Sequence, residues 1–213
     1  AKHRVFQFLD AAILPDNKLI AIASSDAAHL ALLSSHAHRL WYLANSGRIG
    51  VYDQDAVYVK SRCFDPFPFP DLTDAARARL AVAAEEMDAL RKRVLAQHPD
   101  LTLTGLYNVL EAVRAGAPLS DRDASVRDRG LVLILRDLHD DIDRAVTEAY
   151  GWPADLEAAQ IVARLAALNI ERARDEGAGR VRWLRPDFQR PRLAVAGRAG
   201  DLALPEVAAP QRA

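Results

Sequence analysis

Cysteine is nearly absent from this sequence of 213 residues, which contains only Cys63. One cysteine cannot form an intramolecular disulfide or a four-cysteine zinc site, and its scarcity is typical of proteins kept in a reducing cytoplasm. No apolar run approaches the roughly 20 residues that span a bilayer, and no signal-peptide pattern opens the chain. We therefore predict a cytoplasmic protein with no membrane partner.

An excess of charge of either sign is also missing. The chain has 28 Lys and Arg against 29 Asp and Glu, a net charge of −1, which disfavours a generic binder of polyanions. Half of the residues are hydrophobic, as expected for a globular protein. The chain begins at Ala1 without a methionine, and we expect it to be a piece of a longer protein.

Motifs that bind cofactors are absent as well. The sequence has no GxGxxG, no P-loop and no other strand–glycine–helix fingerprint. It also lacks the Asn-Pro-Pro-aromatic motif that holds a flipped adenine in amino-methyltransferases. These absences argue against an autonomous cofactor-dependent enzyme, and we predict no catalytic residue and no cofactor in this chain.

The hydrophobic patterns predict an α+β fold class, in which a small α/β recognition subdomain precedes a mainly α-helical bundle. The first domain is predicted at residues 1–70, where β-forming segments alternate with a turn and one helix. Its predicted elements are strands at 4–9 and 18–23, a helix at 27–45, and short strands at 49–52 and 56–60.

The second predicted domain, residues 71–176, carries four amphipathic helices with apolar residues three and four positions apart, a pattern typical of a bundle. The predicted helix starts are Asp71 or Thr73, Thr102 or Thr104, a capping box at Ser125–Asp128, and Asp155. Residues 177–213 are rich in Arg, Pro and Ala, and we predict an extended basic strap and a disordered tail.

Between the two predicted domains lies the run Cys63–Pro70, in which three prolines alternate with aromatic residues. Proline fixes φ, removes a backbone donor and pushes the preceding residue into extended geometry. We therefore expect a rigid connector that Phe64, Phe67 and Phe69 anchor against neighbouring surfaces.

Two groups of side chains have the composition of a metal or catalytic site. The first contains three histidines of the predicted helix and the lone thiol, and the second is an acidic run on a later helix. The groups are His29, His36, His38 and Cys63, and Asp137, His139, Asp140, Asp141 and Asp143. His29 and His36 can share a helix face, but a zinc site there would need a third ligand from another element. We interpret Cys63 as a buried thiol, His139 as a boundary histidine and the acidic run as a solvated face, and predict no metal site.

Basic residues gather at the start of the chain and before the proline run. Such local groups can contact phosphates in a neutral molecule, because backbone contacts position a protein on DNA without requiring a large net charge. We predict four DNA phosphate contacts on this basis: Lys2, Arg4, Lys60 and Arg62.

Several segments together resemble the C-terminal part of the MmeI-like DNA methyltransferases, which include single-chain type II restriction–modification enzymes. The segments similar to the end of the target recognition domain are 2–6, 14–19, 32–35 with His38 and Trp41, and 64–70. Those similar to the C-terminal helical region are 101–108, 138–146, 149–153 and 182–186.

The resemblance implies a recognition and bracing fragment of an S-adenosylmethionine-dependent methyltransferase of the adenine-N6 type. The implied partners are double-stranded DNA and a methyltransferase domain upstream in the same chain. The cofactor motif, the catalytic motif and the nuclease of the family have no counterpart here, so we expect the fragment itself to be inactive.

Two alternatives stay open. A free-standing helical interaction module would form a dimer through exposed seam residues such as Leu80 and Leu90. A metal-dependent hydrolase would use His29, His36 and Cys63.

Overall fold

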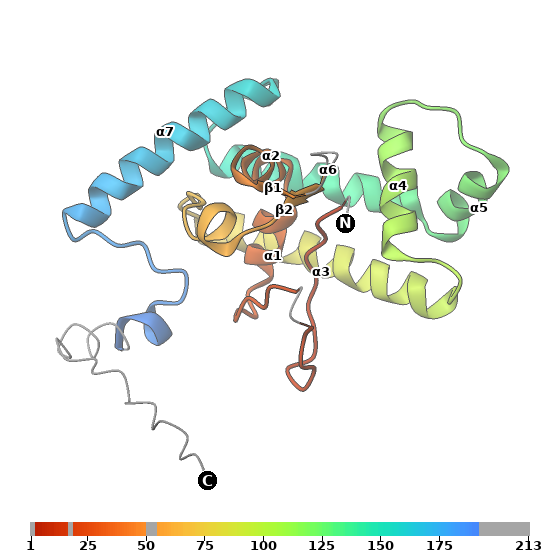
Figure 1. Cartoon of the computed structure of the whole chain (residues 1–213), viewed down its shortest axis with the longest axis horizontal. Coiled ribbons are helices and arrows are strands. Elements are labelled where there is room, and N and C mark those ends of the chain that lie inside the picture. The colour runs from red at the N-terminus through yellow and green to blue at the C-terminus, as the bar shows by residue number, and fades with distance from the viewer. Residues whose placement is uncertain (1–2, 17–18, 50–54, 192–213) are drawn as a thin grey trace, which may run out of the picture. The chain divides into compact units, whose positions relative to one another are not determined.

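The computed structural model describes residues 3–16, 19–49 and 55–191 (Figure 1). Its contacts divide the chain into two units, Ala1–Arg172 and Ala173–Ala213. The elements in chain order are α1 (Ala27–Ser34), α2 (His36–Asn45), β1 (Gly47–Ile49), β2 (Asp55–Val57), the π-helical turn η1 (Lys60–Phe64), α3 (Asp74–Gln97), α4 (Leu103–Arg114), α5 (Asp121–Arg129), α6 (Val132–Ala149) and α7 (Ala158–Gly177).

The predicted α+β class is wrong, because the fold is mainly α-helical. Among the described residues, the only strands are β1 and β2, an antiparallel pair of three residues each that aligns Gly47 with Val57. Residues 4–9 and 19–23 form no strand. A β-forming sequence becomes a strand only where a partner strand and a covered face are available. No such covered face is available here: Leu19, in the second segment, is 58% exposed, and Leu14, between the two segments, is 94% exposed.

The predicted helix at 27–45 is two helices that meet at Ser35. Asp26 caps α1 by accepting the Ala28 N–H at 2.8 Å. Ser35 has an extended backbone, and its hydroxyl donates to the Leu32 carbonyl at 2.7 Å. The same hydroxyl accepts the His38 N–H as the N-cap of α2. A serine that satisfies the end of one helix and the start of the next explains the break.

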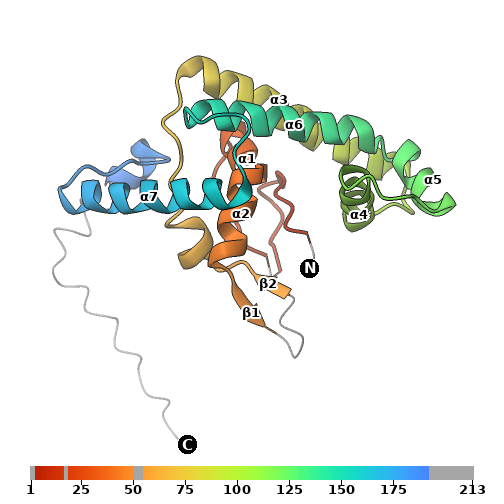
Figure 2. The ribbon, with the colours of Figure 1, turned by 90° about the horizontal axis from the view of Figure 1, so that it is seen from above.

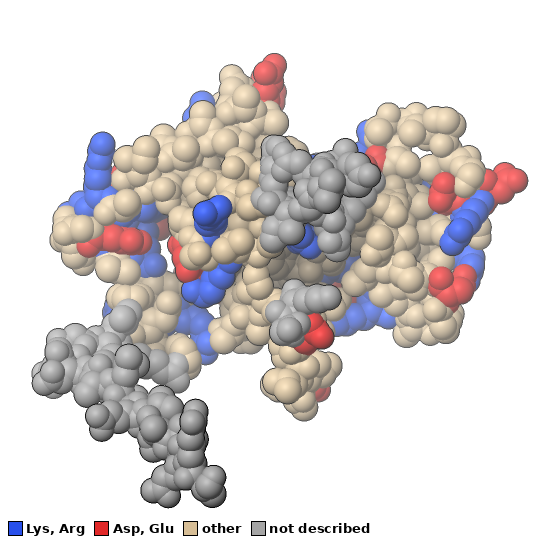
Figure 3. Space-filling view, viewed as in Figure 1, with Lys and Arg blue, Asp and Glu red and all other residues tan. Residues whose placement is uncertain are grey.

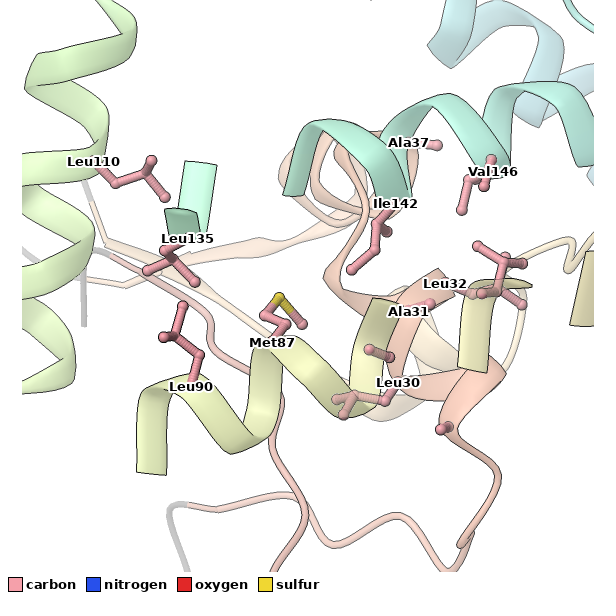
Figure 4. Packing of buried hydrophobic residues seen from close by; sticks show 14 of the residues in the cluster. Leu30, Ala31, Leu32, Ala37, Met87, Leu90, Leu110, Leu135, Ile142 and Val146 are labelled. Atoms are coloured by element: carbon pink, nitrogen blue, oxygen red, sulfur yellow. The ribbon is translucent and has the colours of Figure 1, made fainter. Parts of the chain in front are cut away.

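The core lies where α1, α3 and α6 meet, and α3 and α6 run side by side in opposite directions (Figure 2). Figure 4 shows Met87 and Leu90 of α3 facing Leu135 and Ile142 of α6. Apolar residues three and four positions apart form one stripe on each helix, and burying both stripes holds the pair together. Leu80 is fully buried and Leu90 is 4% exposed, so these positions do not form the exposed seam that a dimerisation module requires.

The helix starts are partly as predicted. Thr73 and Thr102 cap α3 and α4 through their side chains. The predicted capping box at Ser125–Asp128 is wrong, because it lies inside α5, whose cap is Ser120. The bundle region therefore contains five helices in place of four. The boundary predicted at Pro70 lies inside the first unit.

The proline–aromatic connector is fixed by side chains that bind its carbonyl groups. Trp41 Nε1 donates to Cys63 O at 3.1 Å, Tyr150 Oη to Pro68 O at 3.1 Å, and Asn169 Nδ2 to Pro66 O at 2.6 Å. Phe67 is 4% exposed and contacts the Trp41 and His38 rings. Because prolines donate no backbone hydrogen bond, these carbonyl contacts and the buried ring fix the segment.

In the second unit, residues 173–191 are described. Asp175 pairs with Arg180 at 2.5 Å and with Arg182 at 2.7 Å, and residues 186–191 are helical. The predicted tail at 192–213 lies outside the described residues.

Candidate functional site

The predicted phosphate contacts lie on two different elements. Lys2 is outside the described residues. Lys60 and Arg62 are exposed on η1, where the Lys60 ammonium pairs with Asp65 at 2.7 Å. Arg4 is half-buried in the N-terminal segment and lines a cavity. Burial raises the pKa of the Cys63 thiol, and Arg4 and Arg62 both oppose this effect, so both lie within electrostatic reach of that thiol.

A cavity of about 360 Å³ opens beside the junction of α1 and α2. The N-terminal segment, α3, α4 and α6 complete its wall. Four arginines from four separate elements line it, namely Arg4, Arg39 of α2, Arg91 of α3 and Arg114 of α4. Their convergence concentrates positive charge in a molecule with almost no net charge.

A buried polar network lines this cavity. The Arg91 guanidinium is held by Asp88 at 3.1 Å and by the Phe6 carbonyl at 2.8 Å. It also donates to the Tyr107 hydroxyl at 2.9 Å, and that hydroxyl lies 2.9 Å from His139 Nε2. Since Tyr107 accepts from Arg91, its own proton is directed to His139, whose Nε2 must then be unprotonated.

Burial also determines the protonation of His139. It lowers the pKa of His139 to about 3, and the positive charges of Arg114 and Arg91 lower it further. The imidazole is therefore neutral at physiological pH. This agrees with its role as the acceptor for Tyr107.

A carboxylate of α6 binds the first residue of α2 in the wall of the cavity. Asp143 Oδ1 accepts the His36 N–H at 2.6 Å. Burial raises the pKa of Asp143 to about 6, although the His36 N–H and the nearby Arg114 favour its charged form. Arg114 lies 4.0 Å from Asp143 and 2.5 Å from Asp140. The carboxylate thus joins two helices and balances part of the arginine charge.

The candidate metal and nucleophile residues do not form one site, although the His38 ring lies at the backbone of Cys63. His29 Nδ1 bonds Ser24 at 2.8 Å, and His36 lies at the cavity. His38 is fully buried between aromatic rings, and Cys63 is fully buried. In the described part of the chain, no group of three or more His, Cys, Asp and Glu residues has the arrangement of a metal site.

The acidic run on α6 mostly forms ion pairs. Asp137 pairs with the adjacent Arg136 and Asp141 with Arg144, each at 2.7 Å. These carboxylates are more than half exposed, as in the predicted solvated face. Only Asp143 turns toward the interior.

Sequence reasoning missed the four-arginine cavity, although one signal was present. Asp88 and Arg91 are 5% and 2% exposed on the stripe that Met87, Leu90 and Val94 define. An opposite-charge pair three residues apart on an apolar stripe is unusual, because charged residues are almost never fully buried unless they are paired. That pattern indicates a buried ion pair but does not identify its partners from other helices.

The face of the molecule drawn in Figure 3 has no dominant sign of charge. On the face shown in Figure 3, Lys and Arg side chains alternate with Asp and Glu, most clearly at the end that carries α5. There Arg129 pairs with Asp100 at 2.6 Å and Arg127 with Asp128 at 2.7 Å. Such exposed pairs contribute little to stability and attract polyanions weakly.

Comparison with proteins of known structure gives one informative likeness. The fold matches part of a restriction–modification enzyme. The match is to the structure of the type IIL restriction-modification enzyme MmeI in complex with DNA, with a TM-score of 0.51 and 20% sequence identity. It covers 70% of this chain but 16% of that enzyme, so the chain spans about a sixth of the enzyme's length.

The identity is low, so the likeness establishes a shared fold. No protein-family model and no curated protein matches this chain. Within the described residues, none of the helices is both long and apolar enough to cross a membrane.

Proposed function

We propose that this chain is a DNA-recognition and bracing segment of a restriction–modification enzyme that methylates DNA. The observation that carries the proposal is the shared fold with a segment of MmeI, whose structure contains DNA. In this proposal the parent enzyme methylates adenine at N6, and its catalytic domain lies in the same chain as the segment. The segment itself contributes binding and rigidity and performs no chemistry.

The segment's own residues do not fit S-adenosylmethionine, which the parent enzyme would use. Dinucleotide and nucleotide cofactors commonly bind at the carboxyl edge of a parallel sheet, beside a glycine-rich turn. The described residues contain only the short antiparallel pair of β1 and β2, and the sequence has no such glycine motif. Cofactor binding is therefore assigned to another part of the parent enzyme.

Rigid mounting of the connector supports the bracing role. Base discrimination requires side chains held within about half an ångström of their productive positions. Tyr150 of the α6 end and Asn169 of α7 bind the connector's carbonyl groups, and Phe67 of the connector is itself buried. Movement of η1 relative to the helices would break these contacts. The backbone that carries Lys60 and Arg62 is thus held in a defined position.

Lys2, Arg4, Lys60 and Arg62 are the proposed phosphate contacts. The test is the affinity of the chain for a short DNA duplex, measured by fluorescence anisotropy over a range of salt concentrations. Each phosphate contact that is removed should reduce the slope of log affinity against log salt by about 0.9. Lys60→Gln and Arg62→Gln should each produce this change.

Two matched controls are available on α3. Lys92 is exposed and pairs with Asp88 at 2.5 Å, as Lys60 pairs with Asp65 at 2.7 Å, so Lys92→Gln controls for the loss of a paired lysine. Arg93→Gln controls for the loss of an exposed arginine. Binding that does not weaken with salt, or equal slopes in Lys60→Gln and Lys92→Gln, would refute the assignment of these contacts.

A further inference from the structure

The cavity has more positive than negative groups in its wall. Besides the four arginines, it is lined by two carboxylates, Glu111 and Asp143. Asp143 already accepts the His36 N–H at 2.6 Å, and with its pKa raised to about 6 it is mostly charged at neutral pH. The wall itself thus holds four arginines and two carboxylates, and Asp88 and Asp140 pair with Arg91 and Arg114 from outside it.

Buried donor atoms at this cavity are left unused. Arg91 is 2% exposed, and its Nε has no hydrogen-bond partner among the described residues. The hydroxyl of Ser34, at the junction of α1 and α2, is also buried without a partner. Buried donors almost always have an acceptor in a native protein. Two such atoms at one cavity indicate that an acceptor binds there.

The protonation of the neighbouring groups reports the same positive potential. Burial lowers the pKa of His36, and the charges of Arg39 and Arg114 lower it further. Burial raises the pKa of Tyr107, and Arg91 and Arg114 oppose the rise. The arginine charges lower both pKa values, as a positive field does, while burial keeps the pKa of Tyr107 raised on balance.

The size and the remaining wall define the class of ligand. A volume of about 360 Å³ is far larger than a phosphate group needs and lies at the small end of ligand pockets. Tyr42, Tyr107, Phe6 and Leu110 give part of the wall an aromatic and apolar surface. Such a surface suits a base or sugar, while guanidinium groups suit a phosphate because they bind its oxygens in pairs.

We propose that this cavity binds a phosphate-bearing ligand of mononucleotide size, with the arginines on the phosphate and the tyrosines beside the base. This site goes beyond the proposed phosphate contacts on DNA, of which only Arg4 lines the cavity. The ligand is either a free nucleotide or one nucleotide of a nucleic-acid strand, since both present the same groups.

Isothermal titration calorimetry on the full chain tests the site, with dAMP as the probe. Arg114→Gln should weaken dAMP binding roughly tenfold or more, because it removes a charged donor from the phosphate. Arg136→Gln is the matched control: Arg136 is 37% exposed and Arg114 39%, and each pairs with an aspartate. It should leave the affinity within about twofold. Deoxyadenosine, which lacks the phosphate, should not bind.

Three results would overturn the proposal: no binding of dAMP at millimolar concentration, equal affinity in wild type and Arg114→Gln, or inorganic phosphate binding as tightly as dAMP. An NMR titration of the wild-type chain gives a readout that does not depend on how a variant folds. The His36 and His139 imidazole resonances should shift with dAMP, and unchanged resonances would contradict the site.

Duplex binding by the same proteins separates this proposal from the proposed function. If duplex binding persists with its salt dependence but dAMP does not bind, the cavity proposal fails alone. If dAMP binds but the duplex does not, the proposed function fails alone. Competition between dAMP and a single-stranded oligonucleotide supports a strand as the natural source, and binding of dAMP without competition supports a free nucleotide.

Discussion

His38 provides the sharpest test of the packing inferred for the first 70 residues. Its ring lies against Phe6, Tyr42, Tyr58 and Phe67, with ring centres 4.7 to 5.8 Å apart. Its Nδ1 lies 2.8 Å from the Leu33 carbonyl, so Nδ1 carries the proton. Its Nε2 accepts from the Tyr58 hydroxyl at 3.1 Å. Both nitrogens are satisfied in the neutral ring, and protonation would break the Tyr58 bond.

Burial of this ring makes stability depend on pH. It lowers the pKa of His38 from 6.5 to about 4, although hydrogen bonds to backbone groups oppose the shift. Below pH 6.5 the unfolded chain therefore binds a proton that the folded chain does not. The stabilising contribution is complete above pH 6.5 and is lost as the pH falls through 4. The pKa difference contributes a total of about 3 kcal/mol to the free energy of unfolding, of which about 2 kcal/mol is already lost at pH 5.

The perturbation is His38→Gln, and the assay is urea unfolding at intervals from pH 8 to pH 5. Between pH 7 and pH 5, the free energy of unfolding of the wild type should fall by about 2 kcal/mol more than that of the variant. Between pH 7 and 8 the two curves should run parallel, because His38 is then neutral in both the folded and unfolded states.

Other groups titrate in the same range but remain present in both proteins. His139, with a pKa of about 3, adds to the loss in acid. Asp143 opposes it, because a raised pKa of about 6 contributes stability in acid that is lost as the pH rises. Comparing the two proteins cancels both effects. An equal loss in wild type and variant, or an NMR pKa for His38 above 6, would refute the reasoning.

Two further predictions concern close packing and the connector. Gly130→Ala should destabilise the fold by about 1–3 kcal/mol, because a Cβ at this position overlaps the Leu106 side chain. Gly47→Ala is the control: an added Cβ there meets nothing within 4 Å, so the free energy of unfolding should change by no more than about 0.5 kcal/mol. Equal midpoints of thermal unfolding for Gly130→Ala and Gly47→Ala would contradict the close packing at Gly130. Tyr150→Phe should cost about 1–2 kcal/mol, because it leaves the Pro68 carbonyl without its donor. Urea unfolding measures this loss, and an unchanged midpoint would show that the hydroxyl does not hold the connector.

The features predicted correctly from the sequence are those that neighbouring residues determine. Thr73 and Thr102 cap their helices because a threonine side chain reaches only the next turn. The connector's anchoring by Phe67 follows from a rigid proline backbone beside a large apolar ring. The apolar stripe of α3 follows from spacings of three and four residues. All of these depend on interactions within a few positions of the chain.

The features missed or predicted wrongly depend on groups that are distant in the sequence. Residues 4–9 have the composition of a strand but no partner strand to pair with. Arg91 meets Phe6 and Tyr107 only after α3, α4 and the N-terminal segment come together. Likewise, Asp143 accepts the N–H of His36, which lies 107 residues earlier.

The sequence by itself determined where α1, α3 and α4 begin and which faces are apolar, because propensity, capping and periodicity act over one or two turns. The tertiary structure alone decided the fold class, the cavity and the four arginines that line it. The physical reason is that burial, charge and unmet hydrogen bonds at the cavity arise from side chains on separate elements. Their distances are not encoded in any local pattern.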